Sequence, residues 1–252
     1  MSRVRLWQFG LIAGAFLLLE ILCRTQIINP FTMIPPTQML VGLFEAAVNK
    51  PWFWPDVSYT LFNIAAAVAI SIVGGFLIGL GLHAIPRLRR TIDPILTSYY
   101  AVPTFILYPL LIVFCGIGPL SLIVMGALFG IVAMVVATLA ALDRIPRVML
   151  KVAQVTRLDP MRATLLLKLP AAAPHLMSGL RLAVAYSIIG IIAGEFILST
   201  AGIGRRVALS YNNFDNATMY GLLVLILGFA AGVNALLGAF EHALRRRWYH
   251  QS

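Results

Sequence analysis

The feature that most constrains this chain is a long stretch without charge. Between Pro94 and Leu142 the sequence contains no Asp, Glu, Lys or Arg side chain, and the chain turns only once, at residues 115–119. The core of a soluble domain does not supply such a stretch. A bilayer does, because a helix needs about 20 apolar residues to cross the hydrocarbon. The sequence therefore predicts an all-α, polytopic membrane protein.

The composition agrees with this fold class. Of the 252 residues, 60% are hydrophobic and 11% are charged, whereas soluble domains carry roughly 25% charged residues. The formal charge of +10 is explained by where the cations lie in the chain, so no nucleic acid is expected as a partner. Cys23 and Cys115 lie in or at the end of apolar runs, which favours small buried side chains over a disulfide or a metal site.

Six apolar stretches are each long enough to cross a membrane as a helix. They lie at residues 6–23, 59–82, 95–114, 120–142, 180–198 and 219–240. The first follows Arg3 and Arg5 as in a signal peptide, but no small-residue cleavage site comes after it, so we interpret it as an uncleaved span. The third contains Pro103 and Pro109 and is predicted to be kinked or partly unwound.

The cations predict the orientation of these spans. With six spans both termini lie on one side, and that side holds 15 of the 19 Lys and Arg residues. Because positive residues concentrate in cytoplasmic loops, both termini are expected in the cytoplasm. The first external segment is rich in proline turns, and a short amphipathic helix is predicted within it at residues 37–49.

The segment between the fourth and fifth predicted spans, from Asp143 to Arg181, is too long and too charged for a simple hairpin. Asp159 and Pro160 have the character of an N-cap and a first helical residue. We therefore expect two short cytoplasmic helices joined near Leu158. A helix held across the cytoplasmic face is suited to carry the motion of a soluble partner to the spans; the alternative is an interfacial amphipathic helix.

Short patterns along the chain point to a known family. After the predicted loop helix the sequence reads Leu-Pro-Ala-Ala-Ala-Pro at residues 169–174. Further matching residues follow one another in order: Asn29, Pro30, Phe31 and Pro35; Arg87, Arg90, Asp93 and Pro94; Pro103, Pro109, Leu110 and residues 116–118; residues 178–181; and Glu195 with residues 202–204. Over residues 29–248 the chain resembles the permease subunits of bacterial ABC importers, specifically the aliphatic-sulfonate, taurine and nitrate group.

The chain departs from the family pattern in the cytoplasmic loop. Where the family has Glu-Ala-Ala, three further residues and Gly, this sequence has Lys151, Val152, Ala153 and then Arg157. Lys151 reverses the charge of the family's glutamate, and Arg157 lacks the backbone freedom of glycine. We expect a second permease subunit, either a copy of this chain or, given these two departures, a different and more regular permease.

The resemblance implies a type I ABC importer permease, with six spans and a coupling helix between the fourth and the fifth. One transmembrane domain would cover residues 1–252: a first span and external loop at 1–58, and a core at 59–248 with the coupling loop at 143–175. It also implies an inner-membrane chain, surrounded by lipid, that imports a small anion such as a sulfonate, taurine, nitrate or a carboxylate. A periplasmic binding protein would deliver the solute.

No enzymatic activity is expected of this chain, since it lacks the Gly-x-x-x-x-Gly-Lys-Ser/Thr phosphate loop. ATP and Mg²⁺ would belong to a separate ATPase dimer, and no cofactor or metal site is expected here. Of the loop residues, we expect Asp159 to cap the coupling helix, Met161 and Leu165 to make apolar contacts, and Arg157 and Arg162 to pair with the ATPase. The full set expected to couple is Lys151, Ala153, Arg157, Leu158, Asp159, Pro160, Met161, Arg162, Leu165 and Pro170.

Glu195 is the costliest side chain in the predicted spans, because a carboxylate there costs about 2.5–3.5 kcal/mol and usually faces the bundle interior or water. It is a candidate gate or path residue; the alternative is a helix-end carboxylate bonded to a neighbouring span. For Arg205 and Arg206 three roles are open: they favour an anionic solute, they dock acidic residues of the binding protein, or they lie at the membrane–water interface without a specific role. Other residues expected to line a path are Tyr100, Thr104, Tyr108, Tyr186 and Ser187.

Three other classes of membrane protein compete with this interpretation. A secondary transporter needs a coupling site in related repeats, but only Glu195 is available and no inverted repeat is evident. An intramembrane protease needs paired catalytic groups within the spans, and the acids and histidines there do not pair. A non-transporting structural subunit stays open, although it gives no reason for the long cytoplasmic loop.

Overall fold

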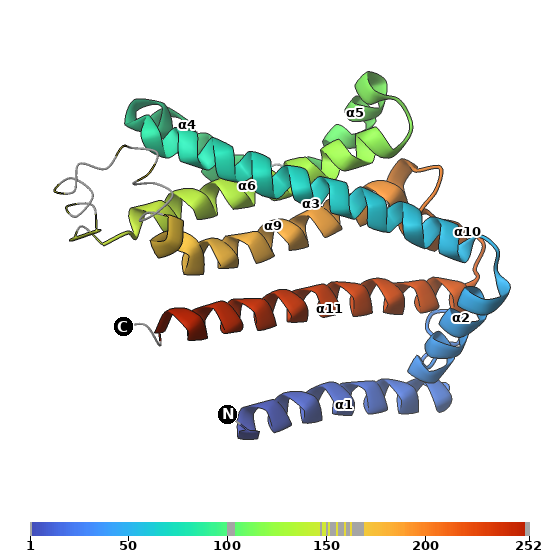
Figure 1. Cartoon of the computed structure of the whole chain (residues 1–252). Helices are drawn as coiled ribbons and strands as arrows, with labels where there is room; N and C mark the ends of the chain where they lie inside the picture. Colours follow the sequence, from blue (N-terminus) through green and yellow to red (C-terminus); the bar gives the residue numbers. More distant parts are fainter. Residues whose placement is uncertain are drawn as a thin grey trace. The chain divides into compact units, whose positions relative to one another are not determined.

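The all-α prediction is confirmed. A computed structural model describes residues 2–99, 104–146, 148–149, 151, 155, 159, 162 and 169–249, and these residues contain helices and no strand. Their order is α1 (Ser2–Arg24), α2 (Pro36–Asn49), α3 (Phe53–Ala84), α4 (Pro86–Tyr99), the 3₁₀ turn η1 (Thr104–Leu107), α5 (Tyr108–Cys115), α6 (Pro119–Asp143), α9 (Leu169–Leu198), α10 (Ile203–Asn212) and α11 (Asn216–Tyr249) (Figure 1).

Five of the six predicted spans each lie within one helix, and each helix is longer than the apolar stretch that predicted it. The first lies in α1, the second in α3, the fourth in α6, the fifth in α9 and the sixth in α11. The predicted external helix is α2. Two helices were not predicted: α4, which begins at the basic residues expected in a loop, and α10, which begins at Ile203 directly after Gly202.

Four of the helices in the described part of the chain are long and apolar enough to cross a membrane: α3, α6, α9 and α11. The third predicted span is divided between α4 and the η1–α5 segment, which pass the same test together but are bent by 95°. Pro109 lies in the first turn of α5, where a missing N–H costs no helical hydrogen bond, whereas Pro103 lies outside the described residues.

The chain forms two compact units, each made of two separate stretches. Unit 1 contains residues Met1–Tyr59 and Glu195–Phe229, and unit 2 contains Thr60–Gly194 and Ala230–Ser252. Three helices, α3, α9 and α11, therefore continue from one unit into the other.

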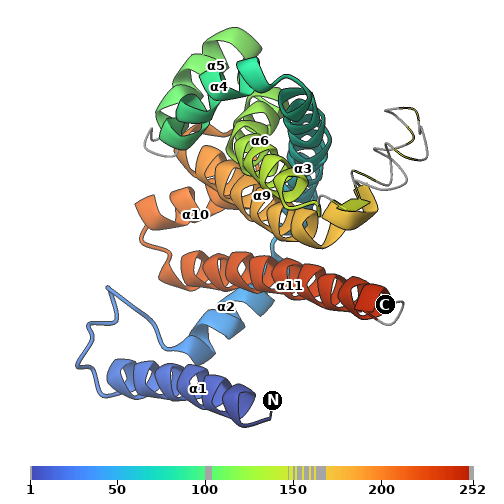
Figure 2. The same ribbon diagram turned by 90° about the vertical axis from the view of Figure 1, so that its left-hand side faces the viewer.

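Small residues bring α3, α6 and α9 together in unit 2, and the two views show these helices side by side (Figure 1, Figure 2). A Cβ atom at Gly126 of α6 would lie 2.9 Å from the Cβ of Ala67 in α3 and 2.8 Å from the side chain of Ile191 in α9. At Gly179 of α9, a Cβ would lie 2.0 Å from Ala137. In lipid, helices associate through such close packing because the hydrophobic effect does not drive them together.

The register of these contacts gives the helix directions in unit 2. Gly75 faces Met134 and Gly79 faces Thr138, so α3 and α6 run parallel. Gly190 of α9 faces Gly126, whereas Gly179 faces Ala137 further along α6, so α9 runs antiparallel to α6. These directions are those expected for the second, fourth and fifth spans of the predicted topology.

Unit 1 has its own apolar core, which joins α2, the start of α3, α10 and the start of α11. Its buried members are Ala46, Phe53, Ile203, Val207, Met219 and Leu222. The helices α2 and α11 touch through their backbones, since a Cβ at Gly42 would lie 2.4 Å from the carbonyl oxygen of Ala217. Phe53 is buried, so of the tryptophan and phenylalanine residues at 52–54 only Trp54 is largely exposed.

We predict that Gly75→Ala destabilises unit 2 by about 1–3 kcal/mol, the usual cost of overpacking a core. The added methyl group would lie 2.6 Å from the Cβ of Met134 and 2.7 Å from the carbonyl oxygen of Ile131, and the backbone atom cannot turn away. Thermal unfolding of the detergent-purified protein measures the change.

Gly81→Ala is the matched control in the same helix, because a Cβ at Gly81 meets no atom within 4 Å. Alanine is a better helix former than glycine, so this variant is expected to unfold at the wild-type temperature or slightly above it. Equal effects of the two substitutions would contradict the packing described here.

Candidate functional site

The predicted path residue Ser187 lies in the seam where α3, α6 and α9 meet. Its hydroxyl oxygen is 3.0 Å from that of Ser71, and the Ser71 hydroxyl donates to the carbonyl oxygen of Ala127 at 3.2 Å. Gly130 leaves room for the pair, since a Cβ there would lie 2.3 Å from Oγ of Ser187. Both serines are fully buried. Within this chain the Ser187 hydroxyl therefore holds α9 to α3, and its part in a solute path remains a prediction.

Thr104 and Tyr108 begin η1 and α5, and both side chains are buried. Tyr108 lies against α9, because a Cβ at Gly194 would be 3.8 Å from its ring. Nearby, the hydroxyl of Tyr99 donates to the carbonyl oxygen of Leu128 at 2.9 Å and so ties the end of α4 to α6. Tyr100 lies outside the described residues.

Tyr186, the remaining predicted path residue of unit 2, lines an open groove between α6 and α9. The groove has a volume of about 390 Å³. Most of its wall is made of small or apolar side chains, and Arg144 and His175 are its charged or titratable members. The lining residues are Ala133, Val136, Ala137, Ala140, Ala141, Arg144, His175, Ser178, Gly179, Leu182 and Tyr186.

In unit 1, Glu195 lies in the last turn of α9, is fully buried and directs its carboxylate to the first turn of α10. Its Oε2 accepts a hydrogen bond from the backbone N–H of Gly204 at 3.0 Å. Gly202 precedes α10 with φ +104°, a conformation that favours glycine. A Cβ at Gly202 would lie 2.4 Å from the carboxyl carbon of Glu195. The carboxylate thus satisfies an N–H in the first turn of α10, where the helix dipole favours negative charge.

Asp56, at the start of α3, also binds the residues at the start of α10. Its Oδ1 accepts from the backbone N–H of Gly202 at 3.0 Å, and its Oδ2 pairs with Nε of Arg206. The guanidinium of Arg206 also lies 4.6 Å from the ring centroid of Trp52, a cation–π distance. Of the two external arginines considered for solute binding, Arg206 therefore has its charge paired inside unit 1, whereas Arg205 has no ion pair among the described residues.

Most of the predicted coupling residues lie outside the described residues: Ala153, Arg157, Leu158, Pro160, Met161 and Leu165. Lys151, Asp159 and Arg162 are described and exposed, and Pro170 is the second residue of α9. The two ends of this predicted coupling segment lie among the described residues of unit 2. Ile145, just after α6, and Ala172, in the first turn of α9, belong to one buried cluster with Leu80 and Leu176.

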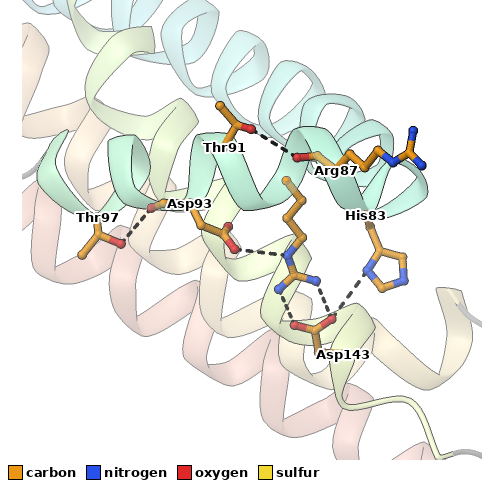
Figure 3. A network of polar contacts seen from close by, with 7 residues as sticks. His83, Arg87, Thr91, Asp93, Thr97 and Asp143 are labelled. Carbon is orange, nitrogen blue, oxygen red and sulfur yellow. Dashed lines mark hydrogen bonds and ion pairs between the residues drawn. The ribbon is translucent and has the colours of Figure 1, made fainter.

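A charged cluster joins α3, α4 and α6 at the point where α6 ends (Figure 3). Arg89 donates two hydrogen bonds to the carboxylate of Asp143, at 2.8 and 2.6 Å. Nδ1 of His83 lies 3.6 Å from Oδ1 of Asp143, and Nε of Arg89 lies 3.6 Å from Asp93. Figure 3 shows the side chain of Arg87 turned away from Asp143.

Sequence reasoning missed the ion pairs that join different helices, because their members are far apart in the chain. Arg89 and Asp143 are separated by 54 positions and Arg206 and Asp56 by 150. Arg181 of α9 likewise pairs with Glu241 of α11 at 3.2 Å. A search for acids among the apolar segments would have found Asp56, Asp143 and Glu241, but not their partners.

These observations define a class of protein: a helical membrane protein with an open groove between two of its long helices. The same fold occurs in a chain of the inward-facing MetNI methionine ABC transporter, with a TM-score of 0.69 at 20% identity over 78% of this chain and 99% of that one. The chain belongs to the family of binding-protein-dependent transport system inner membrane components, whose pattern matches residues 71–249.

Similar sequences come from bacterial transport systems. One, from Haemophilus influenzae, is described as "Probable ABC transporter permease protein" and is 28% identical over 90% of this chain and 92% of its own length. The taurine transport system permease protein TauC of Escherichia coli is 27% identical over 82% of this chain and 77% of its own length. The predicted permease role is thus confirmed: the chain is a translocation subunit of an ABC importer, and ATP hydrolysis belongs to a separate subunit.

We predict that Arg206→Ala destabilises the protein by about 1–3 kcal/mol, because it leaves an acceptor of the buried Asp56 carboxylate without its partner. Arg205→Ala, which removes the neighbouring positive charge, is expected to leave stability unchanged. The unfolding temperatures of the two purified variants measure the difference. A loss of uptake in both variants with no change in either unfolding temperature would instead assign these arginines to solute or partner binding.

Proposed function

We propose that this chain, paired with a second permease subunit, forms the membrane path through which a small anion enters the cell. A periplasmic binding protein delivers the solute, and an ATPase dimer drives the import. Both termini face the cytoplasm, lipid surrounds the bundle, and residues 158–165 dock on the ATPase.

The observation that carries this proposal is the groove between α6 and α9. Its 390 Å³ volume is of the size that holds a small organic solute. Arg144 and His175 line it, and no Asp or Glu is among its lining residues, so its charge suits an anion. The groove is open on one side, which fits a path completed by a second subunit.

The similarity to a taurine permease supports a solute with an acidic group, since taurine carries a sulfonate. Of the two arginines after Gly204, Arg206 adds little to this selection, because its charge is already paired with Asp56. We therefore assign the choice of solute mainly to the binding protein and to the groove.

The second permease is proposed to be a different chain. Lys151 and Arg157 stand where related permeases have glutamate and glycine, and a partner subunit that keeps those residues would supply the regular ATPase contact. Purification of a complex containing two copies of this chain, with no second permease, would contradict this part of the proposal.

Reconstitution tests the function directly. Liposomes that contain the purified permease–ATPase complex are expected to accumulate the anionic ligand of the binding protein only when ATP, Mg²⁺ and the binding protein are all present. Omission of any one should reduce uptake to the rate of empty liposomes. Accumulation without ATP, driven by an ion gradient, would refute an ATP-driven importer.

The predicted docking segment is tested by Met161→Asp. A charged carboxylate at an apolar contact must be desolvated without a partner, which costs several kcal/mol. We expect the variant to insert in the membrane normally and to lose uptake, whereas Met161→Leu, which keeps an apolar side chain, should retain it. Normal uptake by Met161→Asp would show that the ATPase docks elsewhere.

A further inference from the structure

The ion pair between Arg89 and Asp143 joins two elements that lie far apart in the sequence. Arg89 is in the first half of α4, and Asp143 is the last residue of α6. The two hydrogen bonds, at 2.8 and 2.6 Å, are of the bidentate type that fixes both the distance and the orientation of the partners. The pair thus holds one end of α6 against α4.

The contribution of this pair to overall stability is expected to be small. The side chains of Arg89 and Asp143 are 27% and 45% exposed, and partly exposed ion pairs usually contribute about 0–1 kcal/mol because water already solvates both charges. The apolar contacts of Ile92 and Leu96 with Leu82, Val135 and Leu139 fasten α4 to the bundle independently. The pair therefore contributes mainly a fixed position of the end of α6 relative to α4.

The position that it defines is the start of the cytoplasmic segment. Asp143 is followed by Arg144 and by Ile145, whose side chain is buried beside Ala172 of α9. The segment between these residues therefore leaves and re-enters the bundle at one place. Near that place, the Arg89–Asp143 pair provides an ionic contact between the segment's start and α4.

The other charged groups of the cluster support this arrangement. His83 of α3 approaches the same carboxylate at 3.6 Å, so Asp143 lies between side chains from two other helices. Asp93, one turn after Arg89, lies 3.6 Å from its Nε and helps to orient the guanidinium. Arg87 is on the same helix, is exposed and has no ion pair among the described residues, and its side chain points away from Asp143 (Figure 3).

We propose that Arg89 is a positioning residue for transport: through Asp143 it fixes the start of the coupling segment to α4, so that a displacement of that segment moves α4 together with α6. This inference rests on the proposed function, because it assigns the segment to the ATPase. Loss of the pair uncouples the segment from α4 and leaves the bundle folded.

The experiment compares Arg89→Ala with Arg87→Ala in the reconstituted complex. Each variant removes one positive charge from α4, but only the first breaks the contact with Asp143. We expect Arg89→Ala to reduce the amount of solute imported per ATP hydrolysed at least about fivefold, the lower range of measured coupling between sites. Arg87→Ala should keep the wild-type ratio, and both should unfold near the wild-type temperature.

The charge-reversed double variant Arg89→Asp with Asp143→Arg separates a specific contact from a general loss of charge. Each single reversal places like charges together and should lower the amount of solute imported per ATP hydrolysed. The double variant re-forms the pair with opposite polarity and should recover most of it. Failure of the double variant to exceed either single variant, or an unchanged ratio in Arg89→Ala, would overturn the proposal.

Hydrogen exchange provides a measure that does not depend on transport. Amides of residues 144–149 should exchange faster in Arg89→Ala than in Arg87→Ala, because local opening depends on the contacts that hold a segment. Equal exchange in the two variants would exclude a positioning role. If the wild-type complex imported nothing while this exchange difference was present, the proposed function would fail and the positioning by Arg89 would stand.

Discussion

Close contact between helices through glycine, alanine and serine is the constraint on which unit 2 depends. In lipid, apolar side chains are already out of contact with water, so the hydrophobic effect does not drive helices together. Their association relies on packing and on hydrogen bonds between helices. The faces of α3, α6 and α9 meet at Gly75, Gly126 and Gly130, where any side chain would displace a neighbour. The Ser71–Ser187 hydrogen bond lies within this contact. This packing fixes where the groove along α6 and α9 lies and where the chain leaves α6.

Three ion pairs join helices within the chain. Asp56 pairs with Arg206, Asp143 with Arg89, and Glu241 with Arg181. Each pair connects helices that lie apart in the sequence, and Glu195 caps α10. A permease that must change conformation benefits from a pair such as Arg89–Asp143, because a partly exposed ion pair fixes a geometry while contributing little to the free energy of unfolding. These four acidic residues thus act as local links between helices.

The sequence was sufficient to predict the helical class and the positions of the long helices, since an apolar stretch has no other stable form in a bilayer. It was also sufficient for the family, which the match over residues 71–249 confirms. It did not predict α10, because this helix is short, carries Arg205 and Arg206 and begins between two glycines, Gly202 and Gly204, that are typical of a turn. For Glu195, the sequence left open whether the carboxylate faces the bundle interior or water, and its acceptance of the Gly204 N–H depends on a chain reversal that apolar periodicity does not encode.

Ile145 and Ala172 share one buried cluster, so the segment between α6 and α9 begins and ends at the same place on unit 2. A segment anchored in this way places few demands on the helices that it joins. Changes in its length or charge can therefore leave the packing of α6 against α9 as it is. Under the proposed docking of residues 158–165, the contact with the ATPase is a module that can be exchanged without repacking these helices.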